Sequence, residues 1–150
     1  MSGSLDTNVL IGIHSQLKRG VGLRAIIEGI VKLVGSSNLF VTLQVRNEFT
    51  QHFSASSQKT MAQAVLNRLN KEFRVHLLDE GASVELQRKY QQWSHRAGRP
   101  LEKLDLLVLV QTIQEDIDKI VTNDRRFEED IKSLRADGVK APEVIRWGVQ

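Results

Sequence analysis

Short apolar segments with strand character alternate with longer segments of helical periodicity, and this alternation constrains the fold more than any other feature of the chain. The strand candidates are residues 38–41, 74–78, 119–122 and 143–147, the last expected at a sheet edge. Helical apolar spacing is found over residues 21–34, 42–53, 56–73, 83–97 and 102–116, and another helix is expected from about Asn8. Strands separated by helices pair in parallel through crossovers, with helices on both sheet faces. The sequence therefore predicts an α/β fold.

The size and composition of the chain suit one globular domain. Its 150 residues are predicted to form a single domain, 1–150, because no repeat, low-complexity tract or linker divides them. The absence of cysteine excludes disulfides, thiolate zinc sites and a cysteine nucleophile. No apolar run approaches the roughly 20 residues that cross a bilayer, and no leader of basic, apolar and small residues is visible. We expect a soluble, cytoplasmic protein without a membrane partner.

The charge of the chain is mildly basic, with a formal net charge of +3. Its lysines and arginines are scattered rather than run together, as they are on an ordinary solvated surface. The charge therefore permits a polyanionic partner but does not by itself indicate one.

Four acidic residues fall at the ends of predicted elements. Asp6 precedes the first predicted helix, and Asp124 follows the strand predicted at 119–122. Asp105 lies near the start of a very apolar helix, and Glu48 lies on a helix beside its apolar stripe. Each alone is explained as well by a helix cap, a turn or a solvated side chain. In a parallel sheet, however, the strand carboxyl ends and the loops after them meet at one edge, so the four carboxylates are expected to gather there.

A cluster of carboxylates makes physical sense mainly as a site for a divalent metal ion, because the uncompensated charges would repel one another. Hard oxygen ligands without histidine or thiolate select Mg²⁺ or Mn²⁺ over zinc. The histidines show no metal-ligand spacing and are interpreted as structural or surface residues: His14, His52, His76 and His95. The sequence therefore predicts a Mg²⁺ or Mn²⁺ site at one edge of the sheet.

Four segments carry a family resemblance: LDTNVLIGI, VTLQVRNEF, RPLEKLDLLVLV and IVTNDRRF. In this order and spacing they resemble the PIN-domain family of metal-dependent ribonucleases, whose best-known small members are toxins of the VapC type. The resemblance runs from Leu5 to Phe127, and its first and last motifs are the most specific. It implies a PIN-like three-layer αβα fold with a short central, mostly parallel sheet. It also implies hydrolysis of RNA phosphodiester bonds with Mg²⁺ or Mn²⁺.

The resemblance assigns the catalytic and metal-binding roles to the four acids. Asp6, Asp105 and Asp124 are expected to bind the metal directly or through water, and Glu48 to be a further ligand or a base that orients water. The attacking group would be a water whose pKa the cation lowers. No serine, histidine or cysteine nucleophile is required.

Other polar residues near the acids have weaker assignments. By resemblance, Asn8 orients Asp6 or the waters of the metal, and the Thr122 hydroxyl holds a carboxylate. Arg46, Arg125 and Arg126 lie close in sequence to the acids and are candidate contacts for RNA phosphates, although a solvated surface also explains each of them.

Three features depart from the family pattern. Only five residues precede Asp6, so the first strand is expected to be short or imperfectly paired. The helix after Asp105 carries Val108, Leu109 and Val110 where small residues are usual. The stretch beyond Phe127 follows no recognisable motif.

The aromatic pair Tyr90 and Trp93 lies on one predicted helix, three positions apart. Core or interface packing explains such a pair more simply than stacking on a base, although stacking stays open.

The resemblance to toxins also implies partners. A toxin of a type II toxin-antitoxin pair would bind RNA as substrate and a small antitoxin that buries the active site. Homodimers are common among such toxins, and the helix at 21–34 is a candidate surface unless core burial accounts for it. The alternatives are a non-toxin PIN-like nuclease in RNA or DNA processing, such as a relative of flap endonucleases, and a non-catalytic PIN-like interaction module.

Overall fold

A five-stranded, all-parallel sheet in the order β3-β2-β1-β4-β5 forms the centre of the computed structural model, which describes residues 1–148. The strands are β1 (Gly3–Leu5), β2 (Leu39–Val41), β3 (His76–Leu77), β4 (Lys119–Thr122) and β5 (Glu143–Arg146). The predicted α/β class is confirmed, and the sheet is parallel throughout. Residues 149–150 of the predicted domain lie outside the described residues.

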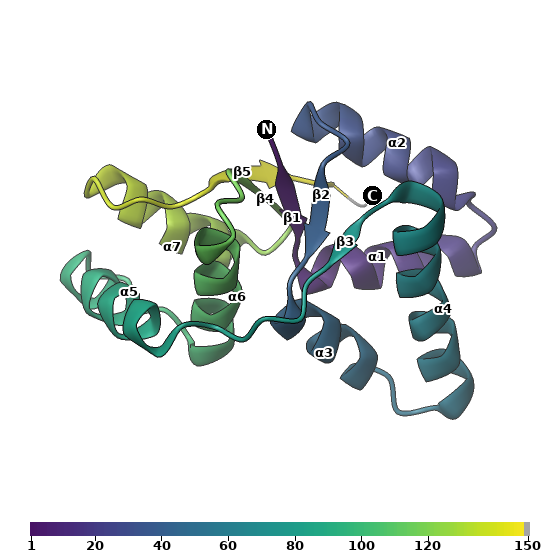
Figure 1. Cartoon of the computed structure of the whole chain (residues 1–150), viewed down its shortest axis with the longest axis horizontal. Coiled ribbons are helices and arrows are strands. Elements are labelled where there is room, and N and C mark those ends of the chain that lie inside the picture. Colours follow the sequence, from purple (N-terminus) through teal and green to yellow (C-terminus); the bar gives the residue numbers. More distant parts are fainter. Residues whose placement is uncertain (149–150) are drawn as a thin grey trace.

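Helices cover both faces of this sheet. They are α1 (Thr7–Lys18), α2 (Leu23–Val34), α3 (Leu43–Gln51), α4 (Ser56–Phe73), α5 (Val84–Arg96), α6 (Lys103–Gln114) and α7 (Arg125–Ala136). Figure 1 shows α1 to α4 on one side of the strands and α5 to α7 on the other. Right-handed crossovers explain this division, because the chain moves from β1 to β3 in one direction across the sheet and then returns through β4 to β5. Among residues 1–148, no helix is long and apolar enough to span a membrane.

The predicted helices are confirmed, with ends that differ from the observed ones by at most two residues. The prediction for 56–73 coincides with α4. The apolar face of α2 is buried, with Ile30 and Val34 fully inside the core. Core burial therefore accounts for this face, which is not free to form a dimer surface. Val108 and Val110, the bulky departures from the family pattern on α6, are also buried.

Helix α7 was not predicted, although local signals for it exist. Asp124 caps its first turn, accepting hydrogen bonds from backbone N–H groups. Phe127, Ile131 and Leu134 are buried at the spacing of one helical face. Gly138 then supplies the left-handed conformation (φ +77°) that ends the segment.

The strand predictions are correct at 119–122 and nearly so at 38–41 and 143–147, where the observed strands are one residue shorter. Strand β5 lies at a sheet edge, as predicted. The prediction at 74–78 is wrong in extent, because only His76–Leu77 pairs in the sheet. Arg74 is left-handed (φ 58°) at the end of α4, and the Val75 N–H still donates to Leu69 of that helix.

Strand β1 is short, as expected, but it pairs with β2 on one side and β4 on the other and so lies in the middle of the sheet. Its first residue leaves little room for a side chain, because a Cβ on Gly3 would lie 3.0 Å from Val34 Cγ1. The preceding Ser2 anchors the strand: its N–H and hydroxyl donate to Asp118 Oδ1 at 2.7 and 2.8 Å.

Candidate active site

The predicted acids occupy the carboxyl edge of the sheet or the helices that begin there. Asp6 follows β1 directly, and Asp124 follows β4, the strand paired beside it. Asp105 lies in the first turn of α6, and Glu48 lies on α3, the helix after β2. Because β2, β1 and β4 are adjacent parallel strands, the fold directs three of these segments to one edge of the sheet.

Asp6 is buried and is held by two hydrogen bonds. Its Oδ1 accepts from the Thr7 N–H at 2.8 Å, which makes Asp6 the cap of α1, and its Oδ2 accepts from the Thr122 hydroxyl at 2.8 Å. The pKa of Asp6 is raised to about 6, chiefly by burial; the hydrogen bonds from Thr122 and Thr7 oppose this rise, and the nearby charges of Glu48 and Asp124 add to it. This carboxylate is costly to ionise without a cation.

Asp105 is half-buried and, within residues 1–148, its carboxylate has no hydrogen-bond or ion-pair partner. Burial raises its pKa to about 7, and the charges of Asp6 and Asp124 are the next largest causes. Coulombic coupling of this kind means that the carboxylates from β1, β4 and α6 share one electrostatic environment.

The other two acids are each partly engaged by hydrogen bonds. Asp124 Oδ1 accepts from the Arg126 and Phe127 N–H groups at 3.0 and 3.2 Å, so Asp124 caps α7, and its charge also raises the pKa values of Asp6 and Asp105. Glu48 is half-buried, and its Oε2 accepts from Gln44 Nε2 at 3.0 Å. In both residues the second carboxylate oxygen has no hydrogen-bond partner among residues 1–148 and is free to bind a ligand.

Thr122 connects the acids of β1 and β4. Its buried hydroxyl donates to Asp6 and accepts from the Asp124 N–H at 3.0 Å. The Asn8 side chain braces this arrangement, since its Nδ2 donates to Thr122 Oγ1 at 3.4 Å and its Oδ1 accepts from the Asn123 N–H at 3.2 Å. Asn8 therefore acts on Asp6 through Thr122, rather than by a direct hydrogen bond.

Two of the three candidate phosphate-binding arginines are paired with acids. Arg46 donates to the Leu78 carbonyl at 3.0 Å and forms an ion pair with Asp79. Arg126 pairs with Glu102 at 2.7 Å. Arg125 is exposed and has no ion pair with any residue from 1 to 148.

Sequence reasoning did not single out two further acids that influence the site. Glu102 and the buried Asp130 both raise the pKa of Asp105. Asp130 Oδ1 accepts from Arg99 Nε at 2.9 Å, which ties α7 to the loop before α6. The position of Glu102 at the cap of α6 was a visible signal, whereas the approach of Asp130 depends on how α7 packs.

The donor set fits a hard divalent cation. Within residues 1–148, no three Asp, Glu, His or Cys side chains stand close enough together to form a ready-made metal cluster. The four acids nevertheless supply only oxygen donors, and two of them have pKa values raised by burial and mutual repulsion. Two hydroxyls near this edge, those of Thr7 and Thr42, are buried and have no partner in the described part of the chain. Positive charge placed among these groups would offset the repulsion.

A family model described as PIN domain matches residues 4–130, a range that contains all four acids. The chain belongs to the PIN-domain family. Members of this family are typically nucleases and usually depend on metal ions. No curated protein sequence matches this PIN domain significantly.

Solved structures share the fold of this PIN domain at low sequence identity. A chain of VapBC2 from Rickettsia felis, solved bound to a promoter DNA fragment, is 18% identical with a TM-score of 0.68, covering 99% of this chain and 100% of that one. VapBC-1 from nontypeable Haemophilus influenzae gives 18% identity and a TM-score of 0.62, with 98% of each chain covered. VapBC-5 from Mycobacterium tuberculosis, a member of the VapBC family of toxin-antitoxin systems, gives 16% identity and a TM-score of 0.57, with 97% of this chain and 98% of that one covered.

Proposed function

We propose that this PIN domain is an endoribonuclease that hydrolyses RNA phosphodiester bonds with Mg²⁺ or Mn²⁺. The observation that carries the proposal is the position of Asp6, Asp105 and Asp124 at the carboxyl edge of the sheet, where burial and then neighbouring acidic charges raise the pKa values of Asp6 and Asp105. Such a cluster destabilises the metal-free fold, and a bound cation offsets that cost.

Each residue of the site has a distinct part in this proposal. Asp6, Asp105 and Asp124 would hold the cation through carboxylate oxygens, and Glu48 would hold it too or orient a water. Thr122 keeps one oxygen of Asp6 engaged, so the carboxylate presents a defined face. When bound, the cation supplies positive charge to the scissile phosphate and lowers the pKa of a water.

A toxin role within a toxin-antitoxin pair is the finer form of this proposal. It is supported by the shared fold with VapBC structures, one of which is described as belonging to a toxin-antitoxin family. The expected partner is a small antitoxin protein that covers the acid site. A short open reading frame directly upstream of the gene would support this role, and co-expression of its product should relieve any growth inhibition by this chain.

The decisive test is cleavage of a fluorophore-quencher oligoribonucleotide by the parent chain and by Asp105→Asn. Cleavage should need Mn²⁺ or Mg²⁺, stop in EDTA and be lost in the variant. Glu143→Gln is the matched control, because it neutralises an exposed acid on β5, outside the site. If Asp6→Asn or Asp124→Asn stays folded and cleaves at the parent rate, the proposed mechanism is wrong. A folded parent chain that never cleaves RNA with metal would support the non-catalytic module instead.

A further inference from the structure

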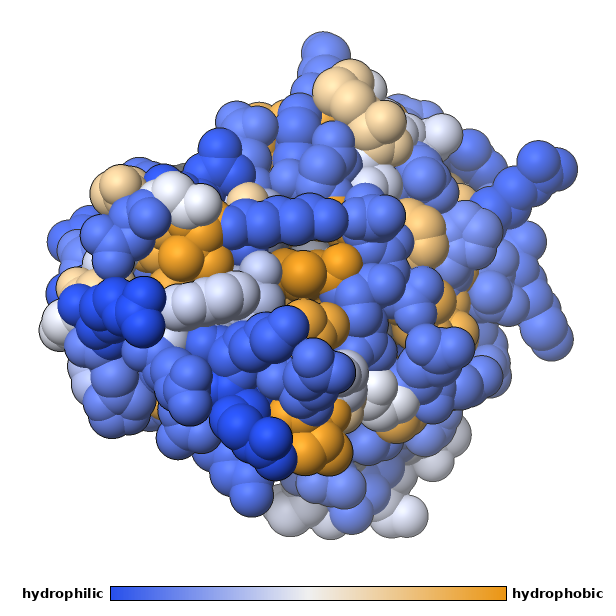
Figure 2. Space-filling model, turned by 60° about the vertical axis from the view of Figure 1, so that its left-hand side comes forward, coloured by the Kyte–Doolittle hydropathy of each residue, from blue (hydrophilic) through white to orange (hydrophobic). Residues whose placement is uncertain are grey.

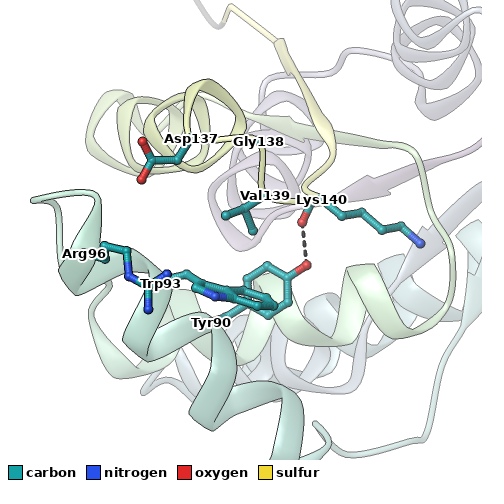
Figure 3. A pocket seen from close by; sticks show the side chains of 7 residues that line it. All are labelled: Tyr90, Trp93, Arg96, Asp137, Gly138, Val139 and Lys140. Atoms are coloured by element: carbon teal, nitrogen blue, oxygen red, sulfur yellow. Dashed lines mark hydrogen bonds between the residues drawn. The ribbon is translucent and has the colours of Figure 1, made fainter.

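The aromatic pair on α5 lines a pocket that lies away from the acids. Its walls come from Tyr90, Trp93 and Arg96 of α5 and from the turn after α7, residues 137–140 (Figure 3). The pocket volume is about 340 Å³. This is near the lower end of the range for ligand pockets, so it has room for one planar ring system rather than a long segment of polymer.

The floor of the pocket is held in place by a hydrogen bond. The buried Tyr90 donates its hydroxyl to the Lys140 carbonyl, which Figure 3 shows as a dashed line. The Tyr90 and Trp93 rings meet edge to face, with centroids 5.0 Å apart and planes at 82°. Tyr90 therefore fixes the indole of Trp93, which is only half-buried and can stack on a flat ligand.

Two opposite charges stand at the mouth of the pocket. Figure 3 shows Arg96 on the α5 side and Asp137 on the α7 side. Both side chains are exposed, and neither forms an ion pair with the other or with any residue in the described range 1–148. A cation and an anion on either side of an aromatic floor suit a flat ligand that offers acceptors along one edge and donors along the next.

We propose that this pocket binds a guanine base. Guanine presents its O6 and N7 acceptors to a guanidinium, here that of Arg96, and its N1–H and N2–H donors to a carboxylate, here that of Asp137. Its ring would stack on Trp93. Adenine has an acceptor at N1 and an amino group at the position of O6, so it would meet the carboxylate and the guanidinium with the wrong partners.

The source of the base is either an RNA strand or a free guanine nucleotide. As part of an RNA substrate it rests on the proposed ribonuclease function and would select a guanine several nucleotides from the cleaved bond, because α7 separates Asp137 from Asp124 by about 20 Å. Figure 2 shows that this side of the molecule is largely hydrophilic, with smaller hydrophobic areas between polar side chains. Such a surface suits a solvated nucleic-acid strand better than a broad apolar partner.

Tryptophan fluorescence tests the proposal without any cleavage. GMP, AMP and CMP are titrated separately into the full chain in EDTA. GMP should quench saturably and bind about tenfold more tightly than AMP or CMP, the discrimination expected of a bidentate base contact. Trp93→Phe should abolish the response, because the other tryptophan, Trp147, is buried and gives a constant background. Asp137→Asn should remove most of the preference for GMP, whereas Glu143→Gln should keep it.

Equal quenching by the three nucleotides, or a preference unchanged by Asp137→Asn, overturns the proposal, as does the absence of saturable binding by GMP. A guanine-containing oligoribonucleotide that binds more tightly than GMP assigns the site to RNA, and equal affinity assigns it to a free nucleotide. The two proposals fail separately. Guanine binding without RNA cleavage would refute the nuclease proposal alone. RNA cleavage without guanine binding would refute the guanine-site proposal alone.

Discussion

The Thr122 hydroxyl donates a hydrogen bond to Asp6 Oδ2 at 2.8 Å and so ties the end of β4 to the end of β1. The same hydroxyl accepts from the Asp124 backbone N–H at 3.0 Å, so one neutral group joins the Asp6 carboxylate to the backbone of Asp124. A buried carboxylate with such a donor is less costly to ionise than one without it. Thr122 therefore lowers the free-energy cost of ionising the buried Asp6.

Replacing Thr122 by valine should destabilise the chain by about 1–3 kcal/mol, because the shape is kept while buried groups of Asp6 and Asp124 lose their partner. Thr122→Ser is the matched control and should recover most of that loss. Urea unfolding followed by circular dichroism measures both. Equal stability of the valine and serine variants would show that the hydrogen bond contributes nothing.

Stability in EDTA should depend on pH through Asp105. Its pKa is raised in the fold to about 7 from 3.8, so its favourable contribution is complete below about pH 4 and is lost as the pH rises through about 7. The asparagine side chain of the Asp105→Asn variant cannot ionise. The stability of this variant relative to the parent should therefore increase from pH 5 to pH 8. We expect an increase of about 1–3 kcal/mol, reduced by solvent screening of this half-buried group. Urea unfolding of both proteins at pH 5 and pH 8 measures this increase. A free-energy difference between variant and parent that stays constant or shrinks with pH contradicts the prediction.

Adding Mn²⁺ should raise the melting temperature of the parent chain. At a metal concentration about 100 times the dissociation constant, binding adds about 2.7 kcal/mol, which shifts the midpoint by roughly 5–11 °C for a chain of this size. The shift should be larger at pH 8 than at pH 5, because protonated Asp6 and Asp105 cannot bind metal. Asp6→Asn should abolish it and Glu143→Gln should not. A parent chain that shows no shift at either pH would argue against the metal site.

The burial of the apolar face of α2 can be tested by comparing a buried and an exposed residue of this helix. Ile30→Ala should cost about 2–5 kcal/mol, because Ile30 is completely buried. Leu33→Ala changes a residue on the same helix that is 49% exposed and should cost under about 1 kcal/mol. Chemical denaturation of both variants gives the comparison. Similar losses at the two positions would mean that this face does not form the core as described.

The link between Arg99 and Asp130 should stabilise the loop that leads to Asp105. Arg99→Met leaves the buried Asp130 carboxylate without its cation and should cost about 1–3 kcal/mol. Arg88→Met, an exposed change on α5, should stay within about 0.5 kcal/mol of the parent. Urea unfolding measures both, and an unchanged Arg99→Met variant would remove this link as a source of stability.

Local patterns were sufficient wherever the structure is set by near neighbours along the chain. The helical spacing at 56–73 predicted α4 to the residue, and the run at 119–122 predicted β4. The same reasoning overextended the strand at 74–78, because the left-handed turn at Arg74 is not marked by a glycine. It also missed α7, whose buried face is spread among many charged residues.

The sequence by itself determined the alternation of strands and helices, and with it the parallel sheet that brings Asp6 and Asp124 to one edge. Periodicity and turn chemistry are local, so they can be seen in one chain without a structure. Only the tertiary structure decided that the charge of Asp130 raises the pKa of Asp105 and that Trp93 lines a pocket with the turn after α7. Those neighbours come from the packing of α5, α6 and α7 across one sheet face, and contacts between distant segments leave no local periodicity to detect.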